Sequence, residues 1–187
     1  MKFINIIFLL FFVSCSMSKS NASGVDFILK SSDIKGGKQI DKKFIFNSFG
    51  CSGQNISPQI SWVSVPPHTK SFALTVFDPD APTQSGWWHW LVLNIPLNFK
   101  EIPQGFGNEN KFNLANGIIQ IRNDFSTFSF GGPCPPAGDK KHRYVFTLYA
   151  LSVEKIDLKE DSSPALASFM INQYVLSKSV IEAIYQR

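Results

Sequence analysis

Short apolar segments, several of them alternating with polar residues, recur along most of this 187-residue chain. Gly-Gly, Ser-Pro and Pro-Pro pairs, which favour turns, separate several of them. Many short strands spaced in this way are typical of an all-β sandwich or barrel. The segments cover residues 25–29, 43–46, 59–62, 71–77, 88–95, 117–122 and 144–151. We therefore predict a mainly β fold, with the 18 phenylalanines supplying much of the core volume.

One stretch near the C-terminus has helical periodicity instead. Ser163 is a suitable N-cap, and Pro164 suits the first helical position. We expect one apolar stripe of this helix to pack against a sheet. The stripe would consist of Leu166, Phe169, Met170 and Gln173 or Tyr174. Beyond it, the pattern is compatible either with continued helix through Tyr185 or with a last short strand.

The N-terminal residues are typical of an export signal. A basic start precedes an apolar run over residues 3–13, which is too short to cross a bilayer because a spanning helix takes about 20 residues. We expect residues 1–14 to be a lipoprotein-type signal peptide followed by a lipidated Cys15, although Phe12 stands where leucine is usual. Ordinary cleavage after Ala22 is the alternative. Both place the protein in the bacterial cell envelope, as a periplasmic protein or a lipoprotein held to the membrane only by its N-terminal anchor.

Composition indicates a single folded domain. Residues 15–24 are rich in serine and suit a flexible tether, which leaves residues 25–187 as the domain. With 44% hydrophobic residues, that length buries one complete core. The formal net charge is only +4 and the basic residues are scattered, so the sequence does not indicate nucleic-acid binding.

Candidate chemistry first occurs between two predicted strands, where residues 78–96 read DPDAPTQSGWWHWLVLNIP. Prolines stiffen the backbone that carries Asp78 and Asp80, because each fixes its own φ and restricts the residue before it. His89 lies at the start of the following strand. Strict alternation would place on one face His89, Leu91, Leu93 and Ile95. A turn that uses Asp and Pro only for local hydrogen bonds is the alternative interpretation.

A second candidate group lies downstream, where GGPCPP at residues 131–136 precedes a strand that starts with His142. Alternation places His142, Tyr144 and Phe146 on one face of that strand and Arg143 on the other. We therefore expect two histidines, two acids and a tyrosine to converge.

The four motifs DPDAP, WHW, GGPCPP and HRYVFTLYAL, in this order, resemble the phosphatidylethanolamine-binding proteins, in the bacterial branch described as Raf kinase inhibitor-like. The resemblance extends from about residue 25 to the C-terminus. It implies an antiparallel β-sandwich with a C-terminal helix, a small anion-binding pocket, and no established catalytic reaction or cofactor. The pocket residues that it implies are Asp78, Pro82, His89, Gly132, Cys134, Pro135, His142 and Tyr144. Asp80 and Arg143 are assigned to structure.

The resemblance also brings together the loops that carry two of the three cysteines. If Cys15 is lipidated, Cys51 and Cys134 remain, and an exported protein can keep a disulfide. We therefore expect a Cys51–Cys134 bond, with two free buried cysteines as the alternative. Cys134 stands where many eukaryotic members have glycine.

The ligand expected from these residues is small and bears a phosphate or a carboxylate. Asp78 would favour a ligand that brings its own proton, or would orient an imidazole. An interaction protein that inhibits a protease or kinase is the main alternative. A metal-dependent hydrolase, with ligands drawn from Asp78, Asp80, His89 and His142, is less favoured, and we predict that the protein is not an enzyme.

Overall fold

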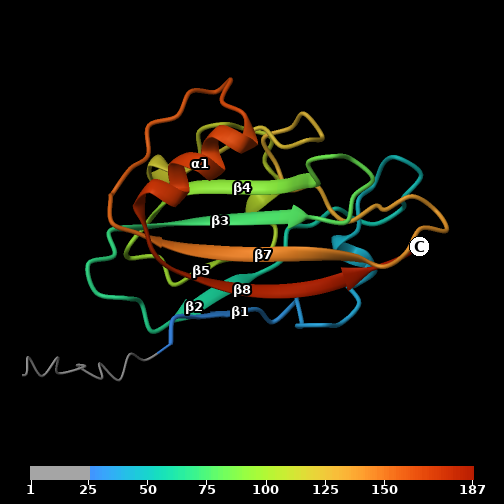
Figure 1. The fold of residues 1–187 in the computed structure, drawn as a ribbon, viewed down its shortest axis with the longest axis horizontal. Coiled ribbons are helices and arrows are strands. Elements are labelled where there is room, and N and C mark those ends of the chain that lie inside the picture. Colours follow the sequence, from blue (N-terminus) through green and yellow to red (C-terminus); the bar gives the residue numbers. More distant parts are fainter. Residues whose placement is uncertain (1–25) are drawn as a thin grey trace, which may run out of the picture.

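Two antiparallel sheets pack against each other in the computed structural model, which describes residues 26–187 (Figure 1). The smaller sheet has the order β1-β2-β5 and the larger one the order β6-β4-β3-β7-β8. The strands are β1 (Ile28–Lys30), β2 (Ile60–Val63), β3 (Ser71–Asp78), β4 (Trp87–Pro96), β5 (Glu101–Ile102), β6 (Ile119–Gln120), β7 (His142–Leu151) and β8 (Val175–Tyr185). The predicted mainly β sandwich is therefore confirmed. The expected signal peptide, the lipidated Cys15, cleavage after Ala22 and the tether lie outside the described residues.

The main core lies between the two sheets. It consists of large apolar side chains such as Trp62 from β2 and Phe72 from β3, whose ring centroids are 4.9 Å apart. A second, smaller cluster lies on the other face of the larger sheet, beneath α1 (Pro164–Tyr174). Both faces of the central strand β3 are therefore buried, which explains why its sequence is almost continuously apolar.

Helix α1 begins where the sequence predicts. The Ser163 hydroxyl accepts a hydrogen bond from the Leu166 N–H at 3.1 Å, and Pro164 follows this N-cap. The predicted stripe is wrong for Leu166 and Phe169, whose side chains are 44% and 59% exposed, and right for Met170 and Tyr174. Ala167 and Ile171 are buried instead, and Met170 and Tyr174 pack beside them. The buried face of the helix is therefore displaced by about one residue from the predicted one.

Three local predictions need correction or completion. Residues 43–46 do not form a strand, because Asp41 caps a 3₁₀ turn, η1 (Lys42–Phe44), that buries Phe44. Strand β5 was not predicted, since two residues carry no readable periodicity. The helix ends at Tyr174 and β8 follows directly, which decides between the two alternatives for the C-terminus. Two further 3₁₀ turns are η2 (Phe106–Asn108) and η3 (Ala115–Gly117).

Within residues 26–187, no helix combines the length and the apolar composition that crossing a bilayer requires.

The observed face of α1 can be tested with two substitutions. Ile171→Ala should lower the free energy of unfolding by about 2 to 5 kcal/mol, because it leaves a cavity in the cluster beneath the helix. Phe169→Ala, at an exposed position, should change it by less than about 0.5 kcal/mol. Denaturant unfolding measures both values. A larger loss for Phe169→Ala would contradict the observed orientation.

Candidate functional site

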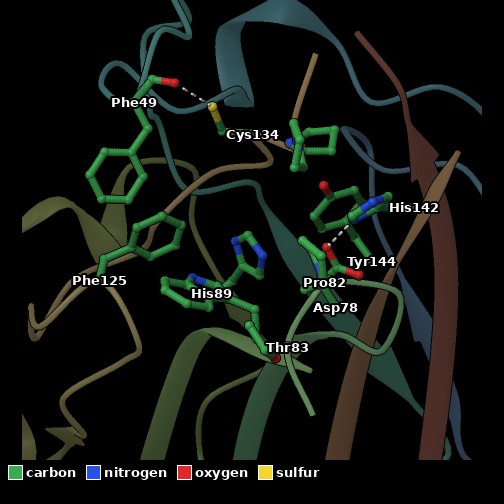
Figure 2. A pocket seen from close by; sticks show the side chains of 13 residues that line it. Phe49, Asp78, Pro82, Thr83, His89, Phe125, Cys134, His142 and Tyr144 are labelled. Carbon is green, nitrogen blue, oxygen red and sulfur yellow. Dashed lines mark hydrogen bonds and ion pairs between the residues drawn. The ribbon is translucent and has the colours of Figure 1, made fainter. Parts of the chain in front are cut away.

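A cavity of about 160 Å³ lies beside the C-terminal end of β3, the start of β4 and the start of β7 (Figure 2). Seven of the eight residues implied by the resemblance line it. They are Asp78, Pro82, His89, Cys134, Pro135, His142 and Tyr144. The two proline-bearing loops that are distant in sequence therefore lie together and leave a hollow between them. Among residues 26–187, no lysine or arginine lines this cavity.

Gly132, the eighth residue implied by the resemblance, does not line the cavity but holds a neighbouring loop in place. Its N–H donates to Asn55 Oδ1 at 2.7 Å, and Asn55 Nδ2 donates to the Phe130 carbonyl at 3.1 Å. A Cβ added at Gly132 would lie 2.0 Å from the Phe44 carbonyl oxygen, so any larger residue would force the loop away. Gly132 and Asn55 thus fix the loop that carries the cavity residues.

His89 reaches the cavity through a β-bulge. Pairing between β3 and β4 passes from Val76 opposite Trp90 to Phe77 opposite Trp88, so His89 is an extra residue in its strand. Bulges of this kind redirect side chains and are common beside functional sites. The expectation that His89 shares a face with Leu91 and Leu93 is wrong, because those two leucines pack in the cluster beneath α1.

His89 is held as a neutral ring. Its Nδ1 lies 2.6 Å from the Gly131 carbonyl oxygen, which can only accept, so Nδ1 carries the proton. The ring is 2% exposed, and this burial lowers its pKa to about 4. In the neutral ring the other nitrogen, Nε2, is a hydrogen-bond acceptor. His89 therefore has an acceptor at Nε2 and no second hydrogen-bond donor to offer.

The surroundings of His142 favour the charged ring, in contrast to those of His89. Its Nδ1 donates to Asp78 Oδ2 at 2.7 Å and its Nε2 to Asp139 Oδ2 at 3.1 Å. Burial alone lowers the pKa of His142, but the hydrogen bonds to the two carboxylates outweigh it and raise the pKa. In turn, the hydrogen bond from His142 lowers the pKa of Asp139. His142 is therefore an imidazolium between two carboxylates.

Two polar atoms of the cavity lining have no hydrogen-bond partner among residues 26–187. They are the Tyr144 hydroxyl and the Trp87 indole N–H, and both are buried. Burial, followed by the charge of Asp78, raises the pKa of Tyr144, so the hydroxyl keeps its proton. A buried polar group without a partner is costly, and such groups in native proteins are rare.

Asp80 and Arg143 lie outside the cavity lining, in an ion pair. Arg143 Nε donates to Asp80 Oδ2 at 2.7 Å, and the Arg143 backbone N–H donates to the same oxygen at 3.0 Å. These bonds lower the pKa of Asp80 to about 2. Arg143 is exposed while its neighbours His142 and Tyr144 are buried, as alternation along β7 predicts. The pair joins the loop after β3 to the start of β7.

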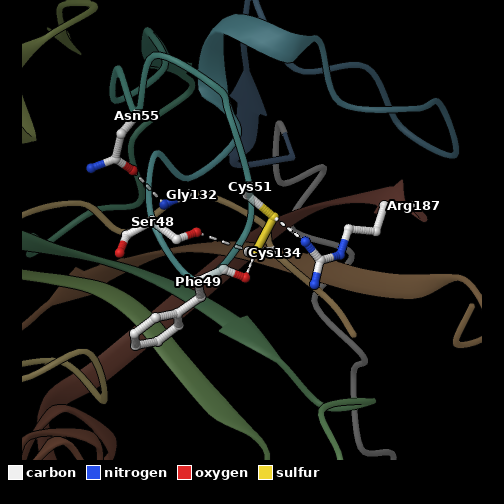
Figure 3. Close-up of a disulfide and its surroundings, with 7 residues drawn as sticks. All are labelled: Ser48, Phe49, Cys51, Asn55, Gly132, Cys134 and Arg187. Atoms are coloured by element: carbon white, nitrogen blue, oxygen red, sulfur yellow. Dashed lines mark hydrogen bonds between the residues drawn. A yellow bond between two sulfur atoms is a disulfide. The ribbon is translucent and has the colours of Figure 1, made fainter. Parts of the chain in front are cut away.

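A disulfide joins Cys51 to Cys134, and Cys134 is part of the cavity lining (Figure 3). It links loops 83 residues apart. The Cys134 sulfur lies 3.6 Å from the carbonyl oxygens of Ser48 and Phe49, in contacts that fix this part of the loop, and Arg187 approaches the Cys51 sulfur at 3.4 Å. The bond therefore holds the loop of Phe49 against the GGPCPP loop.

Three aromatic residues of the cavity lining were not identified from the sequence. They are Phe49, Trp87 and Phe125. Phe125 is positioned by Asn123, whose Oδ1 accepts from the Phe125 N–H at 3.1 Å and whose Nδ2 donates to the His89 carbonyl at 3.0 Å. Of the three, only Trp87 carried a signal, through its place in the WWHW run.

The four side chains proposed as metal ligands do not form a joint cluster. Asp78 is bonded to His142, Asp80 to Arg143, and His89 to the Gly131 carbonyl. In the part of the chain that the structure describes, no three His, Cys, Asp or Glu side chains are grouped closely enough to hold a metal ion.

Removing the disulfide should destabilise the fold. The Cys51→Ser, Cys134→Ser double variant should lose about 3 to 5 kcal/mol of unfolding free energy, because the bond closes a long loop in the unfolded chain. Denaturant unfolding measures this loss, and reduced wild-type protein serves as the matched control. A loss below about 1 kcal/mol in both would show that the two loops are held together by other contacts.

The pKa values of the two cavity histidines should lie on opposite sides of the ordinary value of 6.5, with that of His142 above it and that of His89 below it. His142 should stay charged above that pH, so its contribution to stability is complete below 6.5 and is lost as the pH rises through its raised pKa. His89 should stay neutral down to about pH 4, so stability falls as the pH drops from 6.5 towards 4.

Ring-resolved NMR titration measures both histidines, and Asp139→Asn should lower the pKa of His142 alone. Similar titration midpoints for the two rings in the wild-type protein would contradict the assigned charges.

Comparisons with known proteins agree with this fold. Residues 30–186 match the family model "Phosphatidylethanolamine-binding protein". The chain is 45% identical over 166 residues to the UPF0098 protein YbcL of Escherichia coli K12, covering 89% of this chain and 91% of that protein. It is 42% identical over 157 residues to YbhB of the same organism, covering 84% of this chain and 98% of that protein.

Solved structures give the same result. The crystal structure of E. coli YbcL, described as a new member of the mammalian PEBP family, superposes with a TM-score of 0.83, covering 87% of this chain and 99% of that one. The PEBP homolog CT736 of Chlamydia trachomatis superposes with a TM-score of 0.71 at 28% identity, covering 86% and 97%. The chain therefore belongs to the phosphatidylethanolamine-binding protein family, as a binding protein of the UPF0098 type.

Proposed function

We propose that this protein binds a small ligand through a phosphoryl or carboxyl head that enters the cavity, and that it acts by binding rather than by catalysis. The observation that carries the proposal is the buried Tyr144 hydroxyl, which faces the cavity without a partner in the described residues. A ligand oxygen would satisfy it. The free Trp87 N–H supports the same proposal, because it is a second unused donor on the lining.

Asp78, His89, His142 and Tyr144 form the polar floor of the cavity. Their hydrogen bonds favour a phosphoryl or carboxyl head that has a low charge and carries a proton. Both Asp78 oxygens already accept, one from His142 and one from the Asp80 N–H at 2.8 Å. The neutral His89 offers an acceptor at Nε2, which an acidic P–OH or COOH group can satisfy. With no arginine or lysine in the lining, nothing balances a dianion. The best ligand is thus a monoanionic phosphate ester or a protonated carboxylic acid.

We propose further that the protein works in the cell envelope, after export. The disulfide supports this, because such bonds persist in oxidising compartments, and so does the export-type sequence of residues 1–14. The lipid at Cys15 would be the membrane anchor.

Calorimetry with phosphorylethanolamine and methyl phosphate at pH 5.5 tests the binding site. At this pH most of each ester carries one proton, since the second pKa of such phosphates is about 6. Tyr144→Phe should weaken binding about 10- to 100-fold, because a hydrogen bond to a charged group is lost. The same variant should leave the thermal midpoint of the free protein unchanged or raise it, since it removes an unpaired buried hydroxyl.

Methyl sulfate is the matched control ligand, because it has the same single charge but no proton to donate. It should bind more weakly than methyl phosphate at pH 5.5. Equal binding of the two esters would contradict the role of His89 as an acceptor. Wild-type affinity in Tyr144→Phe would remove the main support for the site itself.

A further inference from the structure

A second hollow, of about 490 Å³, lies beside the disulfide and shares no lining residue with the cavity described above. Cys51 lines this hollow, whereas its partner Cys134 lines the cavity. The charged residues of the hollow are Lys42 and Arg187, and among residues 26–187 no aspartate or glutamate lines it. We call it the basic hollow. The two cysteines of one bond therefore belong to two different surroundings.

Arg187 is placed against the sulfur of Cys51. Its Nη1 donates to Cys51 Sγ at 3.4 Å (Figure 3). The backbone beside it is fixed, because the Arg187 carbonyl accepts from the Gly138 N–H at 3.2 Å. The Gln186 side chain also donates to the carbonyl of Asp139, at 2.8 Å. A disulfide is uncharged, so this guanidinium interacts only weakly with the intact bond, whereas it would stabilise a thiolate at Cys51.

The surroundings of the Cys134 sulfur favour a neutral thiol instead. Its Sγ lies 3.6 Å from the carbonyl oxygens of Ser48 and Phe49. Carbonyl oxygens only accept hydrogen bonds, so they favour a protonated thiol at Cys134 and disfavour a thiolate. If the bond opened, a negative charge would therefore be stabilised at Cys51 and a proton at Cys134.

Charge also determines which sulfur a small anionic thiol reaches. The cavity on the Cys134 side is lined by Asp78 and, among the residues that the structure describes, by no lysine or arginine. The basic hollow on the Cys51 side has a larger volume and two cations. Such cations attract a thiolate, and a carboxylate on the same molecule adds to the attraction. Attack is therefore favoured at Cys51.

We propose that the basic hollow is a thiol–disulfide exchange site for small thiols that carry a carboxylate. The thiolate attacks Cys51 Sγ and forms a mixed disulfide with it, while the Cys51–Cys134 bond breaks. The bonding electron pair leaves with the Cys134 sulfur, which takes a proton from water and then donates a hydrogen bond to the Ser48 or Phe49 carbonyl. A second thiolate attacks the small thiol's sulfur in the mixed disulfide and releases Cys51 as a thiolate beside Arg187. Two thiol molecules are thus oxidised to one disulfide, and the protein's bond is reduced by two electrons.

Exchange at this site acts on the loop that borders the cavity. Phe49 has a φ of +54°, a left-handed conformation that bulky side chains rarely adopt, and it lines the cavity. Gly50, with a φ of +80°, lies against Arg187, since a Cβ added there would be 3.2 Å from Nη1. The disulfide at Cys51 holds both residues in place. Opening the bond therefore releases a strained loop, and the exchange site is coupled to the cavity.

Rates of reduction by three small thiols test the site. They are 3-mercaptopropionate, which carries a carboxylate, uncharged 2-mercaptoethanol and the cationic cysteamine. Each rate, measured at low ionic strength, is divided by the rate of the same thiol with 2-hydroxyethyl disulfide, which removes differences in thiolate fraction and nucleophilicity. Every protein carries Cys15→Ser, so that iodoacetamide labelling and mass spectrometry count only the opened bond. The divided rate should be highest for 3-mercaptopropionate and lowest for cysteamine.

Arg187→Gln should lower the divided rate of 3-mercaptopropionate about three- to tenfold, because one cation beside the attacked sulfur is lost, and that of cysteamine by less than about twofold. Arg122→Gln is the matched control. It removes the same charge from the protein, but Arg122 lies over the Phe128 ring, at 5.1 Å, and is not part of the lining of the hollow. It should leave all three divided rates unchanged.

Equal divided rates for the three thiols, or equal losses in Arg187→Gln and Arg122→Gln, would overturn the exchange site. A lack of reduction by all three thiols, or a mixed disulfide trapped on Cys134 instead of Cys51, would also overturn it. Hydrogen exchange of the amides at residues 48–51 should be faster in the reduced protein than in the oxidised one. Unchanged exchange there would contradict the release of the loop.

Discussion

The buried hydrogen bond between His142 and Asp78 is the interaction on which the site depends. It joins the last residue of β3 to the first residue of the neighbouring β7, and both side chains are almost fully buried. A buried carboxylate without such a partner would cost several kcal/mol, so either group alone would disrupt the end of the sheet. Together they form a polar floor at the point where two loops leave the sheet. Asn55 and the disulfide fix those loops, and the cavity exists because the loops do not fill the space above the floor.

The two histidines show how one cavity contains two different hydrogen-bonding characters. His142 lies between two carboxylates and is a donor at both nitrogens, whereas His89 lies against a carbonyl oxygen and aromatic rings and is neutral. Environments that move the pKa values of paired groups apart assign them different roles. Here the charged ring organises the protein's own carboxylates, and the neutral ring would accept a hydrogen bond from the proposed ligand.

Most of the fold and the polar floor could be predicted from the sequence, and the failures have local causes. Alternation along β7 places His142 and Tyr144 inside and Arg143 outside, because that strand pairs without interruption with β8 over its site-bearing half. The same argument fails in β4, where one bulge is at His89 and a second lies near Asn94, which has a φ of +61°. A bulge changes which residues share a face, and no simple alternation reveals it.

The walls of the cavity could not be predicted for a different reason. Phe49 and Phe125 lie in loops whose conformations are set by partners elsewhere in the chain: the disulfide between Cys51 and Cys134, and the hydrogen bonds of Asn123. Such contacts have no periodicity. The motifs therefore indicate the polar residues of the cavity, whereas its aromatic residues are brought together only by the folded loops.

The charge of the floor explains why these apolar walls matter for affinity. Asp78 and Asp139 with the imidazolium of His142 sum to a charge of −1, and Lys140, a basic side chain on this loop, is paired with Asp80 at 3.6 Å. A site of this kind cannot attract an anion strongly, since it lacks the bidentate cation that makes phosphate binding tight. A ligand of the proposed kind would therefore need burial of apolar surface, at about 25 cal/mol per Å², for much of its binding free energy. In the proposed site the polar floor would orient the head and the apolar walls would contribute the affinity.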